Sequence, residues 1–136
     1  MKKGFLLLYI AVLIVSAGGC RNAATIEPTA IYTQDTTLGD GAKTIEVRII
    51  DDKEEEINIT INTDCENLGD ALRENNLVSG TEGPYGLYIK TVNGTTADYD
   101  VNGAYWAFSK NSEMLSTGAD GEKIEDNATY EIIYTK

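Results

Sequence analysis

The clearest pattern in the chain is an alternation of apolar and polar residues in two neighbouring segments. Apolar residues occupy every second position of residues 43–50 and again of residues 55–63, at Ile45, Val47, Ile49, Ile57, Ile59 and Ile61. Because successive side chains of a strand point to opposite faces, this period of two predicts two half-buried strands. The acidic segment between them, residues 51–56, is predicted to be a solvated turn.

The hydrophobic period changes after residue 66. Leu68, Ala71 and Leu72 follow helical spacing, and Asn67 with Asp70 three positions later is typical of a capped helix start. We therefore expect one short helix over residues 67–75.

The rest of the chain returns to strand patterns. Residues 79–86 contain Gly and Pro84 and are predicted to be a loop, and Asn93-Gly94 is a strong hairpin signal. Further strands are expected at residues 87–92, 95–99, 104–110 (turned at 111–112 into 113–116) and 128–136. The order β-β-α-β-β-β-β predicts an α+β protein with a β-grasp-like fold, in which a mixed sheet wraps one short helix.

The N-terminus has the pattern of an export signal. Lys2 and Lys3 precede an uncharged apolar run of eleven residues, 5–15, which is too short for a membrane span and typical of a signal peptide. Small residues at 16–19 directly before Cys20 resemble the bacterial lipobox, although Ala17 stands where Leu is commonest. We predict that residues 1–19 are a signal peptide and that Cys20 is lipidated, which anchors an extracytoplasmic lipoprotein to the cell membrane. The alternatives are an ordinary secreted protein and an uncleaved anchor.

The predicted mature chain divides into a flexible tether, residues 20–41, and one domain, residues 42–136. Removing residues 1–19 removes two lysines and leaves nine Lys and Arg against 22 Asp and Glu, a net charge of −13. This acidity argues against nucleic acid as a partner. The sequence has no histidine, which removes His-dependent catalysis, and no other catalytic constellation is visible, so we do not expect an enzyme. With Cys20 lipidated, Cys65 is expected to be a structural cysteine before the helix.

Aromatic residues supply the candidate ligand contacts. By alternation, Trp106 and Phe108 share one face of their strand and Tyr105 lies on the other. We expect Trp106 and Phe108 to face the core because they are the more apolar pair. Tyr105 and the loop residues Tyr85 and Tyr99 are then the preferred ligand candidates, and Trp106 joins them if it lies on the surface.

Asp98, Asp100, Asn102 and Gly103 match the first half of a calcium loop, with oxygen ligands at alternate positions before a glycine. The twelfth position is Ser109 in place of Glu, and the predicted flanks are strands. A turn between strands favours the same residues without a metal. These three oxygen-bearing residues are therefore a weak candidate metal site, and we do not expect calcium.

From about residue 44 onward the chain resembles bacterial lipoproteins that carry domain of unknown function 4430 and, more loosely, the C-terminal-like domain of transcobalamin and intrinsic factor. The segments that carry the resemblance are 67–72 (NLGDAL), 82–88 (EGPYGLY), 91–94 (TVNG), 97–100 (ADYD), 103–108 (GAYWAF) and 130–135 (YEIIYT). The resemblance implies a β-grasp-like fold and an exported, lipid-anchored setting. In the eukaryotic proteins this domain closes over a corrinoid, which makes cobalamin or another corrinoid the implied ligand.

Two functions remain open at this point. One is a ligand-binding module that captures a small molecule, with a pocket lined by Tyr85, Tyr99 and Tyr105. The other is an interaction or assembly module for an envelope protein, with a flat apolar patch in place of the pocket.

Overall fold

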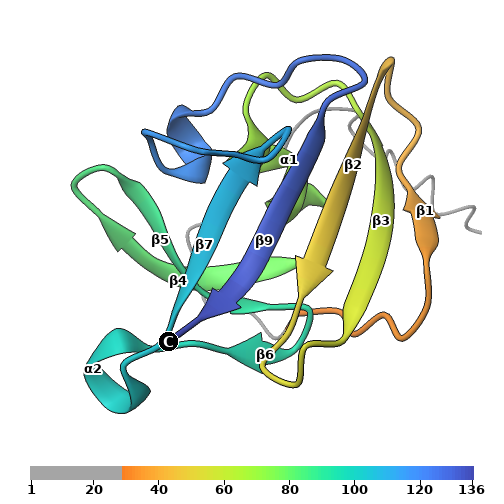
Figure 1. Cartoon of the computed structure of the whole chain (residues 1–136). Coiled ribbons are helices and arrows are strands. Elements are labelled where there is room, and N and C mark those ends of the chain that lie inside the picture. Colours follow the sequence, from red (N-terminus) through yellow and green to blue (C-terminus); the bar gives the residue numbers. More distant parts are fainter. Residues whose placement is uncertain (1–28) are drawn as a thin grey trace, which may run out of the picture.

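The computed structural model describes residues 29–136, which form a mostly β protein with two sheets (Figure 1). The larger sheet contains β1 (Thr36–Leu38), β2 (Lys43–Ile50), β3 (Glu56–Thr63), β7 (Tyr105–Lys110), β8 (Glu113–Met114) and β9 (Thr129–Thr135). The smaller sheet contains β4 (Val78–Gly83), β5 (Gly86–Val92) and β6 (Thr95–Thr96). The helices are α1 (Leu68–Glu74), α2 (Tyr99–Asn102) and the 3-10 helix η1 (Ala119–Gly121). The strand orders are β1-β3-β2-β9-β7-β8 and β4-β5-β6.

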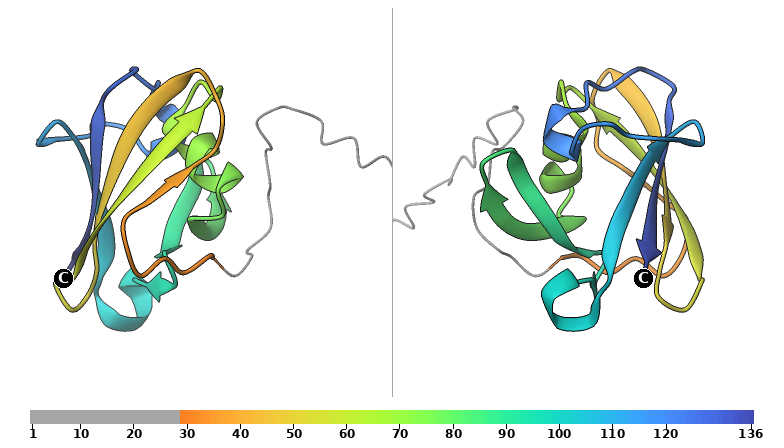
Figure 2. Two further views of the ribbon diagram at one scale, coloured as in Figure 1. Left: turned by 90° about the vertical axis from the view of Figure 1, so that its right-hand side faces the viewer. Right: turned by 60° about the vertical axis from the view of Figure 1, so that its left-hand side comes forward.

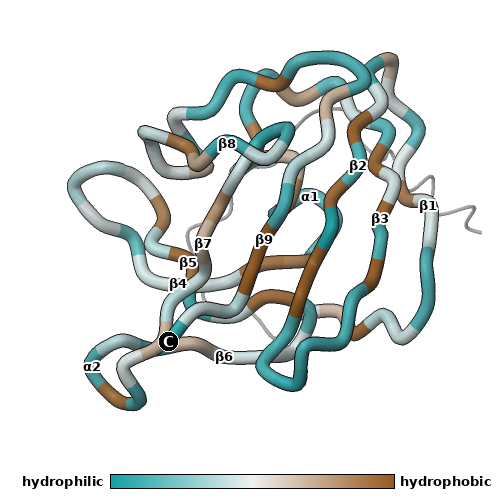
Figure 3. The backbone as a smooth tube through the Cα atoms, in the orientation of Figure 1, coloured by the Kyte–Doolittle hydropathy of each residue, from teal (hydrophilic) through white to brown (hydrophobic). Residues whose placement is uncertain are grey.

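The two alternating segments form the predicted antiparallel hairpin of β2 and β3. Val47 lies opposite Ile59, and both side chains are fully buried. The alternation of hydrophobic and hydrophilic positions can be followed along these strands in Figure 3. The last strand, β9, pairs in parallel with β2 and antiparallel with β7. The first long strand and the last strand of the chain thus lie side by side in the middle of the larger sheet.

Helix α1 forms where the change of period predicts it, and it lies on the inner side of the larger sheet (Figure 2). The Asn67 side chain accepts a hydrogen bond from the backbone N–H of Asp70 at 2.8 Å, which confirms the predicted cap. Leu68, Ala71 and Leu72 are fully buried. The smaller sheet lies on the same side as α1 (Figure 2). Among residues 29–136 no helix is long and apolar enough to cross a bilayer.

The predicted β-grasp-like α+β fold is wrong. Residues expected to form a loop, 79–86, instead supply most of β4, which pairs with β5 in a separate sheet. The glycines that indicated a loop serve a strand here: the register shifts between Ser79 and Gly80, and a Cβ at Gly80 would lie 1.9 Å from the carbonyl oxygen of Tyr88. Glycine therefore allows a bulge and a close approach of two backbones. The core is enclosed by a helix and a second sheet, and no single sheet wraps the helix.

Two further segments differ from the sequence interpretation. The return strand expected at residues 95–99 ends after Thr96, and Asp98 caps the short helix α2. Within the expected tether, β1 pairs in parallel with β3, so the folded part begins before residue 42. Asn93 fixes this N-terminal segment: its Oδ1 accepts from the N–H of Tyr32 at 2.7 Å, and its Nδ2 donates to the Tyr32 carbonyl at 2.9 Å.

Candidate functional site

An apolar hollow of about 180 Å³ lies between β5 and β7, where the two sheets meet without a shared ladder. We call this hollow the groove. Its lining residues are Leu87, Tyr88 and Ile89 of β5, Tyr105, Trp106 and Phe108 of β7, and Gly118 and Ala119 at the start of η1. In Figure 1 the hairpin of β4 and β5 diverges from β7 at this place. The groove combines aromatic rings with a mostly apolar surface, which suits the flat face or edge of a small molecule.

Side chains link β5 to its surroundings at both ends of the groove. Near α2, the indole Nε1 of Trp106 donates to the Lys90 carbonyl at 2.9 Å. Near η1, the backbone N–H of Leu87 donates to Asp120 Oδ2 at 2.8 Å. Between these two hydrogen bonds lie Tyr88 and Ile89, which line the groove.

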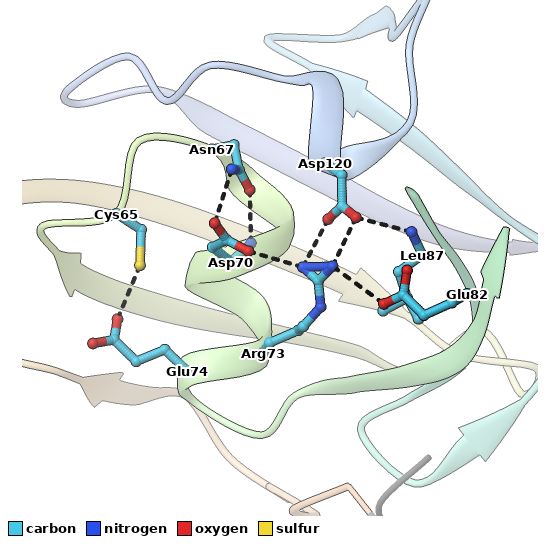
Figure 4. Close-up of polar contacts among 8 residues, drawn as sticks. All are labelled: Cys65, Asn67, Asp70, Arg73, Glu74, Glu82, Leu87 and Asp120. Atoms are coloured by element: carbon cyan, nitrogen blue, oxygen red, sulfur yellow. Dashed lines mark hydrogen bonds and ion pairs between the residues drawn. The ribbon is translucent and has the colours of Figure 1, made fainter. Parts of the chain in front are cut away.

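The Asp120 end of the groove is supported by a cluster of charges (Figure 4). The guanidinium of Arg73 donates to both carboxylate oxygens of Asp120, at 2.8 and 2.7 Å, and also to Asp70 at 3.0 Å. Glu82 of β4 lies 3.9 Å from the same guanidinium. The Arg73 side chain is only 6% exposed, so this bidentate pair is shielded from water. The cluster joins α1, η1, β4 and β5.

The structure places the predicted ligand residues in two groups. Tyr105 and Trp106 line the groove. Trp106 is 6% exposed, as the core prediction requires, and Tyr105 is 41% exposed. Tyr85, at the turn between β4 and β5, is 94% exposed, and Tyr99 on α2 is 63% exposed. Neither Tyr85 nor Tyr99 lines the groove, so the expected pocket of three tyrosines does not form.

The sequence gives no binding signal for several residues at the groove. Leu87 and Ile89 lie in a segment with an ordinary strand pattern, and the polar, turn-rich segment 118–127 contains the groove residue Ala119 and its neighbour Asp120. One signal was present for Asp120: a glycine, Gly69, in the first turn of a short helix is costly unless something packs against it closely.

The predicted calcium residues form a turn around α2. Asp98 Oδ1 accepts from the N–H of Asp100 at 3.1 Å, and Asp98 Oδ2 pairs with Lys90 at 3.3 Å. Asn102 Oδ1 accepts from the N–H groups of Asp98 and Ala104, both at 3.2 Å. The Asp98 and Asn102 oxygens thus already satisfy turn donors and a lysine. Within residues 29–136, no group of three or more His, Cys, Asp and Glu side chains is arranged to hold a metal.

A second hollow of about 270 Å³ lies beneath the N-terminal segment, between Tyr32, the β2–β3 turn and the Asn93-Gly94 turn. Two of its acidic residues, Asp51 and Glu56, have structural partners. Asp51 Oδ1 accepts from the N–H groups of Lys53 and Glu55, each at 2.9 Å. The hydrogen bond from the Arg48 guanidinium lowers the pKa of Glu56 below its ordinary value. The mixed, acidic lining makes this hollow less suited than the groove to a flat apolar ligand.

The predicted signal peptide and Cys20 lie outside the described residues. Cys65, expected to be structural, is 2% exposed beside the start of α1, and its Sγ lies 3.4 Å from Glu74 Oε2.

Solved structures of other proteins share this fold. A protein from Ruminococcus gnavus ATCC 29149, described as a "putative metal binding protein", has 35% identity and a TM-score of 0.67, with coverage of 70% of this chain and 98% of the other. Haptocorrin in complex with Cbi has 19% identity and a TM-score of 0.51, with coverage of 73% of this chain. That match spans 26% of haptocorrin, and at this identity it shows a shared fold alone. A sequence search among curated proteins finds no match.

The family model described as Domain of unknown function (DUF4430) matches residues 66–136, which include α1, the smaller sheet, the groove and β9. This match spans more than half of the chain, and the Ruminococcus gnavus protein aligns over nearly its whole length. The chain therefore belongs to the DUF4430 family, as the sequence resemblance indicated.

Proposed function

We propose that this protein is a small-molecule-binding lipoprotein whose ligand inserts a flat apolar edge into the groove between β5 and β7. The observation that carries the proposal is the groove itself: two strands face each other without a ladder, and both contribute aromatic side chains. Tyr88 and Tyr105 are 47% and 41% exposed there, so their rings are accessible to a ligand. If this surface were part of the core, the rings of both tyrosines would be buried.

We propose a corrinoid as the ligand class, because the sequence resembles the transcobalamin family and because haptocorrin, which shares the fold, was crystallised in complex with Cbi. The groove volume of about 180 Å³ is smaller than the roughly 300–1,000 Å³ of pockets that enclose a drug-sized ligand. This domain therefore covers one edge or face of a ligand of that size. We expect an affinity no tighter than about micromolar, or about −8 kcal/mol, unless a second protein covers the other face.

The setting we propose is extracytoplasmic, with the domain anchored to the membrane by a diacylglycerol on Cys20. The basic n-region, the eleven-residue apolar run and the small residues before Cys20 support this setting. Two acyl chains are enough for stable anchoring, because each buried methylene contributes about 0.8 kcal/mol.

An absorbance titration of the purified protein with cobinamide and with cobalamin tests the ligand. We expect saturable spectral changes that Tyr105→Ala weakens by about 1 to 2 kcal/mol, as for an aromatic binding residue. Tyr99→Ala is the matched control: it removes another exposed tyrosine that does not line the groove, and it should leave the affinity unchanged. No spectral change and no calorimetric heat at about millimolar ligand would contradict the proposal. The function would then be that of an interaction module, for which Tyr85, Tyr99 and Val101 offer exposed apolar contacts.

A further inference from the structure

We propose that Asp120 is a positioning residue that sets the width of the groove and thereby restricts which ligands enter it. This inference rests on the proposed function, because it concerns the same groove. Asp120 does not line the groove; its carboxylate lies behind two residues that do, Leu87 on β5 and Ala119 on η1. Its hydrogen bond to Leu87 connects β5 to η1, which follows β8 in the chain.

The first argument is the position of the hydrogen bond. The groove extends along β5 from Leu87 to Ile89. At one end Asp120 holds the N–H of Leu87, and just beyond the other end Trp106 holds the carbonyl of Lys90. No ladder joins β5 to β7 between these points. Side chains at the two ends therefore hold β5 in place, against η1 at one end and against β7 at the other, and the middle remains open.

The second argument is that both carboxylate oxygens of Asp120 act as acceptors. Oδ1 accepts from Arg73 Nη1 at 2.8 Å, while Oδ2 accepts from Arg73 Nη2 at 2.7 Å and from the N–H of Leu87 at 2.8 Å. An asparagine of the same shape would direct its NH2 group at one of these donors. The site thus requires a carboxylate for its hydrogen-bonding pattern as well as for its charge.

The third argument is that two glycines lie directly beside this carboxylate. A Cβ at Gly69 of α1 would lie 1.9 Å from Asp120 Oδ1, and a Cβ at Gly86 of β5 would lie 2.6 Å from Oδ2. Gly86 also has a φ of +102°, which disfavours other residues. Two glycines from different elements therefore let the backbone approach Asp120 closely.

The fourth argument is charge compensation. A carboxylate held among backbone groups needs a cation, and the 6%-exposed guanidinium of Arg73 supplies it in bidentate geometry. Asp70 accepts from the same guanidinium at 3.0 Å, and its other hydrogen bonds are to Asn67 rather than to β5. Asp70 thus provides a matched control, since its loss weakens the charge cluster without releasing the β5 wall.

The experiment compares the full-length protein with its Asp120→Asn and Asp70→Asn variants by amide hydrogen exchange and by cobinamide titration. In Asp120→Asn we expect exchange of residues 86–90 to become about tenfold faster, with β2 and β3 unchanged, because the release is local. We expect the cobinamide dissociation constant to rise about tenfold. In Asp70→Asn both quantities should stay within about twofold of the unmodified protein.

Unchanged exchange of β5 in Asp120→Asn would overturn the proposal. Equal acceleration of β5, β2 and β3 would also overturn it, since Asp120 would then support only global stability. Faster exchange of β5 with an unaltered cobinamide affinity would show that Asp120 holds β5 without affecting ligand binding, which would overturn the proposed role in ligand selection. If the unmodified protein does not bind cobinamide, the proposed function fails, whereas hydrogen exchange still decides whether Asp120 holds the β5 wall.

Discussion

The indole of Trp106 connects the two sheets by donating its Nε1–H to the Lys90 carbonyl at 2.9 Å. The same ring packs edge-on against Tyr134, with centroids 5.5 Å apart and an interplanar angle of 85°. At 6% exposure this ring combines a large buried apolar surface with a satisfied donor. One side chain therefore contributes both to the core and to the placement of the groove's β5 wall.

Trp106→Ala is expected to lower the free energy of unfolding by about 3 to 5 kcal/mol, the usual cost of emptying a large aromatic site. Trp106→Phe should cost less, because it keeps most of the ring and because the Lys90 carbonyl still accepts from the N–H of Ala97. Urea unfolding followed by circular dichroism measures both. Trp106 is the only tryptophan, so tryptophan fluorescence cannot report on its variants. A native unfolding midpoint for Trp106→Ala would contradict its place in the core.

Asn93→Gly should loosen the N-terminal segment while the turn is retained. Asn93 has a φ of 46°, which glycine adopts freely, so the substitution removes the two hydrogen bonds to Tyr32 without backbone strain. We expect a loss of about 1 to 2 kcal/mol of stability and faster amide exchange of residues 30–38. Asn111→Gly, which makes the same change at a φ of 48° in the β7–β8 turn, is the control and should leave that exchange unaltered.

Stability should fall in alkaline solution partly through Tyr130. Burial raises the pKa of this phenol above its ordinary value of 10.0. The unfolded tyrosine then loses its proton first, so the folded state is progressively disfavoured as pH rises above about 10, until the folded phenol also ionises. Free energies of unfolding measured between about pH 8 and pH 11 should fall less steeply in Tyr130→Phe than in the unmodified protein. Parallel slopes for the two proteins would refute the assignment.

Cys20→Ser is expected to abolish acylation and to leave an unprocessed or released protein. The motivation is the signal pattern of residues 1–19, followed by a cysteine directly after small residues. Metabolic labelling with a fatty-acid probe measures the acylation. Label retained in Cys20→Ser would rule out this lipid anchor.

The sequence alone was sufficient to predict the elements whose signals are local. Alternation over residues 43–50 and 55–63 predicted the β2–β3 hairpin, and the change of period with its Asn67 cap predicted α1. The inward position of Trp106 also followed from alternation, because a strand gives its two faces different polarity. These features depend on neighbours within a few residues, so the pattern contains the information needed to place them.

Only the tertiary structure decided how the strands divide into two sheets and what lies between them. Gly80 and Gly83 weaken the strand signal of β4. Position 80 nevertheless needs a glycine, because a Cβ there would collide with the carbonyl oxygen of Tyr88. This contact arises only when β4 pairs with β5, so it has no local signal in the sequence. Asp120 is separated from Arg73 by 47 positions and from Leu87 by 33, and no period in the sequence relates them. The local pattern determines which face of an element is apolar, whereas contacts between distant segments determine which faces meet and where a groove remains.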